Sequence, residues 1–524
     1  MRATPFLLAL FWTATVPCLL QAAPVSAAQA APVSAAQAAP VSAAQAAPVS
    51  AAQAADTRAD FLQNIVRVTV TAQPYDFARP WSKRAPSSRR ALGTVLEGNR
   101  ILVTAEVVAN ATYIELESPD GEQKQPASVE CVDYEADLAL LKPESPDFFK
   151  TRPGLRFATP QVGDSLSILQ LEANGNPLFS KGPMTTAEVV RYPVDDSSFL
   201  VGRLNVPLQI RESTQSLPLF KEGKLAGVML RYDPQSSLLD FIPAAVVEHF
   251  LKDAVKSPYE GFPRMGCSFA VTRDPQLRRY LGLNGNNGGV LITQLLKGGP
   301  AEKGGLLKGD VLLEIAGNPI DSDGNYRDET YGRISLGHLV CTKHFEGEKV
   351  KVRLLRDGKP VEAEVPVARR HPEKYLSEPY IIDRAPNYYV LGGLILQELS
   401  RQYLKEFGTD WPRKAPMDLV NIDRTQGEID GEVRQRVVVL SRVLPSDVTV
   451  GYEDLRHLVL KSVNGQAIGS LSDVPEALSK SERGVHRLEF LSDPSVIFLD
   501  AKAVEAAGPS LQRSYGLPAL SRLQ

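Results

Sequence analysis

Cysteine and histidine are both scarce in this sequence, whose 524 residues include 4 cysteines and 6 histidines. The wide spacing of the cysteines excludes a disulfide scaffold, a zinc knuckle and a CxxC redox motif; they are Cys18, Cys131, Cys267 and Cys341. We predict neither a metal site nor a cofactor. Lys and Arg total 58 against 61 Asp and Glu, a net charge of −3, so no basic excess favours nucleic acid as a partner.

Residues 1–22 are typical of a secretory signal peptide. A short positive start precedes a mostly apolar run from Phe6 to Leu20, and small residues follow it. The run is too short and too interrupted for a membrane span, and no later stretch is long and apolar enough for one. We expect an exported protein, periplasmic or otherwise extracytoplasmic, without membrane contact. An uncleaved signal anchor is the alternative interpretation.

Residues 23–57 are predicted to be a disordered spacer. The octapeptide APVSAAQA occurs four times between Ala23 and Ala54. The proline in each octad costs about 3 kcal/mol in a helix interior. No large apolar side chain recurs that could build a core, so the repeat is expected to stay flexible.

Between residues 58 and 256 the pattern is mostly strand. Short β-rich runs such as 65–71, 101–103 and 225–230 are separated by turn residues. Many short strands with few helical stretches favour a barrel or a sandwich. One amphipathic helix is expected at about 243–255, where it closes the region.

Three segments of this region carry a more specific pattern. They are 101–108 (ILVTAEVV), 132–141 (VDYEADLALL) and 213–220 (STQSLPLF), the last followed by 223–228 (GKLAGV). In order and spacing they resemble the histidine, aspartate and serine segments of the HtrA/Deg serine proteases. The resemblance implies a trypsin-like double β-barrel.

The same resemblance implies that the catalytic triad is degenerate. The histidine position carries Glu106, the acid survives as Asp137, and the nucleophile position carries Gln215. A carboxylate does not replace the imidazole that shuttles the proton, and an amide cannot form an acyl intermediate. A check that needs no alignment agrees, because the first histidine in the chain is His249. We therefore expect a pseudoprotease.

The loop around position 215 also departs from the family pattern. Ser213, Ser216 and Leu217 replace glycines, and their side chains are expected to obstruct the turn that forms the oxyanion hole. The alternative is a displaced site, in which Ser213 or Ser216 pairs with a lysine at 221 or 224.

Residues 257–370 resemble a PDZ domain of the HtrA/Deg kind. The resemblance rests on the run 299–320, GPAEKGGLLKGDVLLEIAGNPI. Such modules add an extended peptide as an extra strand and hold its C-terminal carboxylate on backbone N–H groups. The resemblance implies a groove helix that begins near Ile334. It also implies these peptide-binding residues: Arg264, Met265, Gly266, Cys267, Ser268, Phe269, Ala270 and His338.

Two alternatives stay open within this domain. His338 is either a groove residue or a surface helix residue. A disulfide between Cys267 and Cys341 is considered because the protein is expected to be exported.

Residues 371–524 resemble a second, divergent PDZ domain. The runs 388–394 (YYVLGGL), 437–444 (VVVLSRVL) and 458–465 (LVLKSVNG) are similar to the second PDZ domain of the plant-type Deg branch. The polar stretch 414–436 is predicted to be a loop. The fold class expected for the whole chain is therefore mostly β: a double β-barrel followed by two α+β domains.

The function implied by these resemblances is binding without hydrolysis. We expect a catalytically inactive protein that binds peptides or unfolded-protein C-termini through the first PDZ domain, or that scaffolds an assembly. A homo-oligomer, a trimer or a multiple of one, is the expected state. One alternative is an ATP-independent serine endopeptidase in protein quality control with a displaced nucleophile. The other is a regulatory subunit in mixed oligomers with active homologues.

Overall fold

The computed structural model describes residues 62–193, 197–210, 214–283, 288–426 and 434–523. The predicted signal peptide, the spacer and Ser213 lie outside the described residues. All described residues belong to one unit of the chain, 52–524.

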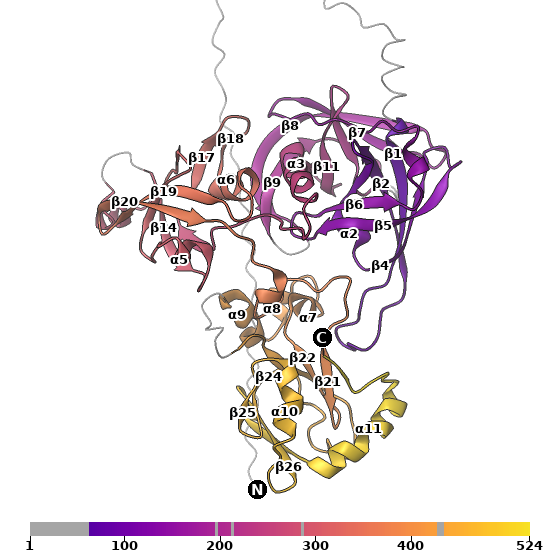
Figure 1. Cartoon of the computed structure of the whole chain (residues 1–524), viewed down its shortest axis with the longest axis vertical. Coiled ribbons are helices and arrows are strands. Elements are labelled where there is room, and N and C mark those ends of the chain that lie inside the picture. The colour runs from indigo at the N-terminus through magenta and orange to yellow at the C-terminus, as the bar shows by residue number, and fades with distance from the viewer. Residues whose placement is uncertain (1–61, 194–196, 211–213, 284–287, 427–433, 524) are drawn as a thin grey trace, which may run out of the picture. The chain divides into compact units, whose positions relative to one another are not determined.

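The first domain is a closed six-stranded barrel (Figure 1). Its strands pair in the order β1-β2-β3-β6-β5-β4. They are β1 (Ile65–Ala72), β2 (Ser87–Leu96), β3 (Arg100–Val103), β4 (Ala111–Glu117), β5 (Lys124–Asp133) and β6 (Leu138–Pro143). On β1 the valines at 66, 68 and 70 are buried and the polar residues between them are partly exposed, which is the period of a strand with one buried face. A Cβ on Gly93 would lie 2.8 Å from Cγ2 of Ile101, so the barrel interior has no room for a side chain there.

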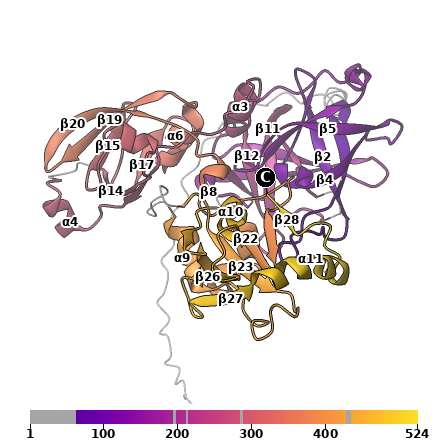
Figure 2. The same cartoon turned by 60° about the horizontal axis from the view of Figure 1, so that its bottom comes forward.

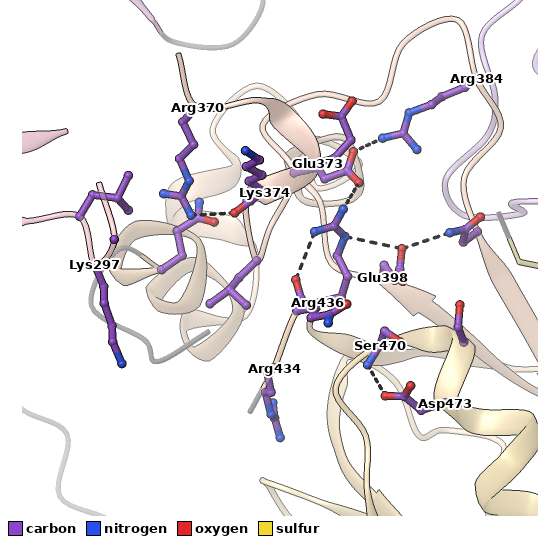
Figure 3. Close-up of a pocket in the computed structure, with 18 of the residues that line it drawn as sticks. Lys297, Arg370, Glu373, Lys374, Arg384, Glu398, Arg434, Arg436, Ser470 and Asp473 are labelled. Atoms are coloured by element: carbon purple, nitrogen blue, oxygen red, sulfur yellow. Dashed lines mark hydrogen bonds and ion pairs between the residues drawn. The ribbon is translucent and has the colours of Figure 1, made fainter. Parts of the chain in front are cut away.

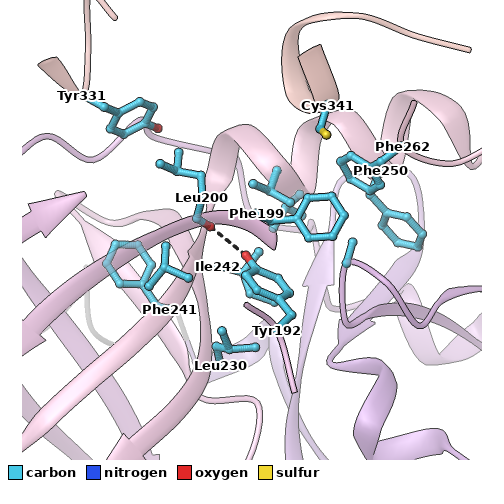
Figure 4. Packing of buried hydrophobic residues seen from close by; sticks show 14 of the residues in the cluster. Tyr192, Phe199, Leu200, Leu230, Phe241, Ile242, Phe250, Phe262, Tyr331 and Cys341 are labelled. Carbon is cyan, nitrogen blue, oxygen red and sulfur yellow. Dashed lines mark hydrogen bonds between the residues drawn. The ribbon is translucent and has the colours of Figure 1, made fainter. Parts of the chain in front are cut away.

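The second domain is another closed six-stranded barrel, with the order β10-β11-β12-β9-β8-β7. Its strands are β7 (Ser165–Leu171), β8 (Pro177–Arg191), β9 (Ser198–Asn205), β10 (Pro218–Lys221), β11 (Lys224–Asp233) and β12 (Leu238–Pro243). Its core consists mostly of Leu, Ile and Val side chains with a few aromatic rings among them, and the Tyr192 hydroxyl donates to the carbonyl oxygen of Leu200 at 2.7 Å (Figure 4). Helix α3 (Ala244–Asp253) follows, which confirms the helix expected at the end of this region.

The third domain is built on a sheet in the order β13-β14-β15-β19-β20, with β16 beside β15 and a separate β17–β18 hairpin. Its strands are β13 (Cys267–Ala270), β14 (Val290–Leu295), β15 (Val311–Ile315), β16 (Asn318–Pro319), β17 (Asn325–Asp328), β18 (Gly332–Ser335), β19 (Lys349–Arg356) and β20 (Lys359–Pro366). Its helices are α4 (Pro275–Tyr280), α5 (Pro300–Lys303) and α6 (Leu336–Lys343). The helix predicted near Ile334 is α6, and Ile334 itself lies in β18.

The fourth domain repeats the strand order of the third as β22-β23-β24-β26-β27 and adds β21 and β28 beyond β22 (Figure 2). Its strands are β21 (Tyr388–Leu391), β22 (Leu394–Glu398), β23 (Val438–Val443), β24 (Leu458–Val463), β25 (Gln466–Ala467), β26 (Val485–Phe490), β27 (Val496–Asp500) and β28 (Ser521–Arg522). Its helices are α7 (Arg401–Lys405), α8 (Trp411–Lys414), α9 (Met417–Thr425), α10 (Val474–Leu478) and α11 (Ala501–Tyr515).

The prediction that 414–436 is a loop is wrong for its first half. Helix α9 occupies Met417–Thr425, and its Leu419 and Val420 are fully buried in a cluster with residues of α7 and α8. The stretch is polar in sequence because the buried face of α9 includes a charged residue, Asp423, which forms an ion pair with Arg401 at 3.1 Å, beside Leu419 and Val420.

No helix in the described part of the chain is long and apolar enough to cross a membrane.

Candidate functional site

Glu106 lies on the short helix α2 (Ala105–Val108), directly after β3. Its side chain is exposed. The guanidinium of Arg89 donates to the carbonyl oxygens of Glu106 at 2.6 Å and of Ala109 at 2.9 Å, so it satisfies carbonyl groups that so short a helix leaves unpaired. Glu106 is therefore held in place by its backbone, and its carboxylate faces solvent.

Asp137 lies in the turn between β5 and β6, with φ of 53° and a fully buried side chain. Its Oδ1 accepts a hydrogen bond from the backbone N–H of Glu106 at 2.8 Å. Its Oδ2 is buried and has no partner within the described residues. Burial raises the pKa of Asp137 to about 8, and the charge of Glu106 acts in the same direction. Asp137 is therefore a neutral carboxylic acid near neutral pH rather than the ionised partner of an imidazolium.

Gln215 and Ser216 lie in the loop before β10, and hydrogen bonds join this loop to the segments around Thr104 and Leu92. The hydroxyl of Ser216 accepts a hydrogen bond from the backbone N–H of Thr104, and the carbonyl oxygen of Gln215 accepts one from Leu92. Ser216 has φ of 54°, a left-handed conformation that glycine adopts more readily, and its side chain is buried. The side chain of Gln215 is exposed. The three predicted segments thus meet, with an amide exposed at position 215.

All six histidines lie in the described part of the chain, and none belongs to the segments that carry Glu106, Asp137 and Gln215. His249 is packed between the rings of Phe262 and Phe345, with ring centroids 4.4 and 4.2 Å away. Its Nδ1 lies 2.9 Å from the carbonyl oxygen of Thr342. Among the described residues, the hydrogen-bond partner of the Asp137 carboxyl is thus the backbone of Glu106 and not an imidazole.

The displaced serine–lysine site finds no support at Ser216. The hydroxyl of Ser216 is bonded to a backbone N–H, and Lys221 forms an ion pair with Asp164 at 2.7 Å. Cys131 is no better as a nucleophile, because burial raises its pKa to about 12 and keeps it a thiol.

The predicted carboxylate loop leads into β13, which pairs with β14 on one side only. The backbone N–H of Arg264 donates to the carbonyl oxygen of Ala368 at 3.0 Å, and Met265 is buried. Gly266 has φ of 73°, and a Cβ there would lie 2.9 Å from Cδ of Pro300. The last residues of the predicted set lie on β13 with exposed or partly exposed side chains: Cys267, Ser268, Phe269 and Ala270.

His338 lies on α6 but is not at the surface, so the surface alternative is wrong. Only 2% of the residue is exposed, and its ring packs edge-on against Tyr331 with centroids 5.8 Å apart. Burial lowers the pKa of His338 to about 4. The sequence did not predict this because α6 is enclosed by other parts of the chain: five of its eight residues are buried. A role for His338 in contacting a peptide stays a prediction.

The disulfide considered between Cys267 and Cys341 is not present, since both are free thiols. Cys341 lies in the same hydrophobic cluster as Phe250 and Phe262 (Figure 4). Burial raises the pKa of both thiols, to about 11 for Cys267. Within the described residues, no group of three His, Cys, Asp or Glu side chains is arranged to hold a metal ion.

The fourth domain differs from the third at the corresponding sheet edge. Strand β22, which occupies the place of β13, is paired along its outer edge by β21, with Tyr388 opposite Gln397 and Leu391 opposite Leu394. Strand β28 pairs in turn with β21. Among the described strands, one edge of β13 is therefore unpaired, whereas both edges of β22 are paired.

Comparison with protein families finds two PDZ domains. The model described as a PDZ domain matches residues 263–367, and a second model with the same description matches 378–521. The two six-stranded barrels followed by two PDZ domains confirm the predicted fold class.

Curated relatives cover most of the chain. Protease Do-like 2, chloroplastic, from Arabidopsis thaliana is 26% identical over 88% of this chain and 75% of its own length. Protease Do-like 4, mitochondrial, from the same plant is 26% identical over 86% of this chain and 84% of its own length. The probable periplasmic serine endoprotease DegP-like of Rickettsia conorii is 24% identical over 54% of each chain.

Among solved structures, the HtrA-type protease AlgW with a decapeptide is 19% identical and covers 61% of this chain and 99% of its own length, with a TM-score of 0.46. The serine endoprotease from Yersinia pestis is 15% identical and covers 60% of this chain and 98% of its own length, with a TM-score of 0.41.

Proposed function

Because this chain is an HtrA/Deg-family protease homologue with two PDZ domains, we propose that it binds extended or unfolded polypeptides through its first PDZ domain without hydrolysing them. The observation that carries the proposal is the set of residues at this site: the buried Asp137 accepts from the backbone N–H of Glu106, which occupies the histidine position, and Gln215 occupies the nucleophile position. Attack by a serine with general base catalysis needs an imidazole at the first of these positions and a hydroxyl at the second.

The open edge of β13 supports the binding half of the proposal. A peptide added there gains main-chain hydrogen bonds, and the left-handed Gly266 lets the preceding loop turn close to Pro300. The paired edge of β22 makes the second PDZ domain the less suitable receptor.

The binding half is tested with a matched pair of glycine variants. Gly266 and Gly317 both have positive φ, 73° and 76°, but an added Cβ meets Pro300 only at Gly266. Fluorescence anisotropy with labelled C-terminal peptides is expected to show at least about tenfold weaker binding for Gly266→Ala and unchanged binding for Gly317→Ala. Equal affinities for both variants would contradict binding at this loop.

The catalytic half is tested by incubation with a denatured protein substrate. No cleavage is expected from the wild type. Turnover that survives Gln215→Ala and purification controls would defeat the inactive-barrel proposal.

The second candidate function is a serine endopeptidase with a displaced nucleophile, and the names of the curated relatives favour it. A fluorophosphonate probe separates the two functions. Covalent labelling of Ser213 or Ser216 would support the endopeptidase, and an unlabelled protein supports the binder.

The assembly and its location complete the proposal. We propose an exported homo-oligomer, a trimer or a multiple of one, on the basis of the signal-like N-terminus and the family resemblance. A regulatory subunit in mixed oligomers is the competing assembly, and co-purification with an active homologue would favour it over a strictly homomeric mass.

A further inference from the structure

A cavity of about 550 Å³ opens beside the N-terminal end of β13. Its walls come from Gly266–Ser268, from the loop 294–300 and from the segment 366–370. It shares five lining residues with a larger neighbouring cavity of about 1260 Å³ (Figure 3): Leu296, Lys297, Gly298, Arg370 and Lys374. We call the two cavities together the basic trough.

The smaller cavity is lined by cations and by no Asp or Glu. The cations are Arg264, Lys297, Lys303, Arg369, Arg370 and Lys374. The positive charges of Arg264 and Arg369 are balanced by a carboxylate, because both side chains form ion pairs with Glu135, at 3.2 and 2.9 Å. Within the described residues, the side chains of Lys303, Arg370 and Lys374 have no carboxylate partner.

Arg370 is partly buried in spite of this missing partner. Its guanidinium lies over the ring of Tyr375 at 3.9 Å and donates to the carbonyl oxygen of Lys374 at 3.0 Å. Burial lowers its pKa, as it does for Arg434 on the far side of the larger cavity. Lys303 and Lys374 are exposed, so among these four cations only Arg370 and Arg434 are partly shielded from water. A guanidinium partly shielded from water and without a carboxylate is stabilised when a ligand supplies the negative charge.

Most carboxylates of the larger cavity are already engaged. Glu378 pairs with Arg384 and Arg436, and Asp473 accepts hydrogen bonds from the backbone N–H groups of 469 and 470. Glu302 accepts one from the backbone of Gly298. Glu398 pairs with Arg436, and Glu373 is exposed. Among the described residues that line the trough there are nine Lys and Arg against five Asp and Glu, so the lining is positively charged overall.

The trough begins where a peptide on β13 would end. A peptide that adds antiparallel to this edge has its carboxyl-terminal end beside residues 264–266, and Gly266, Cys267 and Ser268 line the smaller cavity. A bound chain that continues past residues 264–266, instead of ending with its carboxylate on that loop, would turn toward the β14 side, where Gln294 and Leu295 also line the smaller cavity.

We propose that the basic trough receives an acidic stretch at the carboxyl-terminal end of the polypeptide bound to β13. The trough thus sets a preference for Asp- and Glu-rich ends, and this inference rests on the proposed peptide-binding function. Carboxylates placed there meet Lys303, Arg370 and Lys374, and the bidentate geometry of the guanidinium of Arg370 suits them.

The test compares two labelled peptides with the same apolar stretch, one ending in four glutamates and the other in four glutamines. Anisotropy titrations of the full chain are expected to give at least about tenfold tighter binding of the glutamate peptide at low salt, shrinking as salt screens the charges. In K303Q/R370Q/K374Q the preference should fall to about twofold or less, with the glutamine peptide unaffected. The matched control K308Q/K351Q/K359Q removes three exposed lysines that do not line the trough and should keep the preference.

Two further variants test whether the trough itself causes the preference for the glutamate peptide. The single variant K303E reverses the charge of an exposed lysine and leaves Arg370 intact. It should still weaken binding of the glutamate peptide and leave binding of the glutamine peptide unchanged. The titrations are repeated in E428Q/D430N/E432Q, because this acidic run precedes Arg434 in the sequence, and the preference must persist there.

The results separate this inference from the function on which it rests. If both peptides bind the wild type equally, or if the preference survives in the trough variant, the acidic-end inference is overturned and the binding function stands. If neither peptide binds, the proposed function itself fails.

Discussion

Replacing Asp137 by Asn is expected to stabilise the protein near neutral pH. The unfolded chain ionises this carboxyl at about pH 4, whereas the folded chain keeps it neutral up to about pH 8. A carboxyl whose pKa is raised on folding favours the folded state at low pH and costs stability as the pH rises between the two values. Asparagine avoids that cost because it is neutral in both states.

The size of the effect follows from the pKa difference. Each pH unit between the two values costs about 1.4 kcal/mol, so at about pH 7 the Asn variant is expected to be more stable by about 4 kcal/mol. The two proteins should be nearly equal at about pH 4. Asn also fits locally, because it tolerates the left-handed φ of 53° and its oxygen can still accept from the N–H of Glu106.

The assay is urea unfolding at a series of pH values, followed by circular dichroism. Asp137→Ala is the control, because it removes the acceptor and should destabilise at every pH. A D137N protein that is destabilised at neutral pH, or whose stability difference does not change with pH, would refute the neutral carboxyl and with it the claim that no cation sits beside it.

Three further predictions follow from other parts of the structure. Burial lowers the pKa of His338 to about 4, so between about pH 6.5 and pH 4 this residue is protonated in the unfolded chain and neutral in the folded chain. The free energy of unfolding should therefore fall by about 1.4 kcal/mol for each pH unit below about pH 6.5. In H338F, titrations of the folded and unfolded protein should no longer show this difference in proton uptake. The double variant Glu106→His with Gln215→Ser should not restore cleavage of a denatured protein; cleavage would show that the loop forms a working oxyanion hole. Gly202→Ala places a Cβ 2.3 Å from the ring of Phe241 and should destabilise by more than about 2 kcal/mol in urea unfolding. The control is Gly337→Ala, whose Cβ would have no neighbour nearer than Oγ of Ser335 at 3.7 Å.

Local sequence patterns predicted the strands well because each strand carries its own period, but they left a barrel and a sandwich open, and the double barrel was expected only from the family resemblance. The alternation in β1 and the apolar runs of β3 and β11 are set by which side chains face a barrel interior, and this is visible in neighbouring residues. Helix α9 was missed because its buried face mixes Leu419 and Val420 with Asp423, and their burial and pairing depend on residues of other segments, among them Arg401 of α7.

The candidate site was predicted in part, and for a similar reason. Sequence order was enough to expect that Glu106, Asp137 and the loop at 215 meet, and hydrogen bonds do join these segments. The neutral state of Asp137 and the burial of His338 were not predictable, because both depend on packing between segments distant in the chain. The cations of the basic trough are likewise scattered from 264 to 374 and form no motif.

The central claim is that this protein binds polypeptides and does not cleave them. A single peptide that carries a fluorophore and a quencher tests both halves at once, through anisotropy for binding and dequenching for cleavage. The account predicts a rise in anisotropy with no dequenching over many hours at saturating protein. Dequenching that scales with protein concentration and is abolished by Ser216→Ala would contradict it.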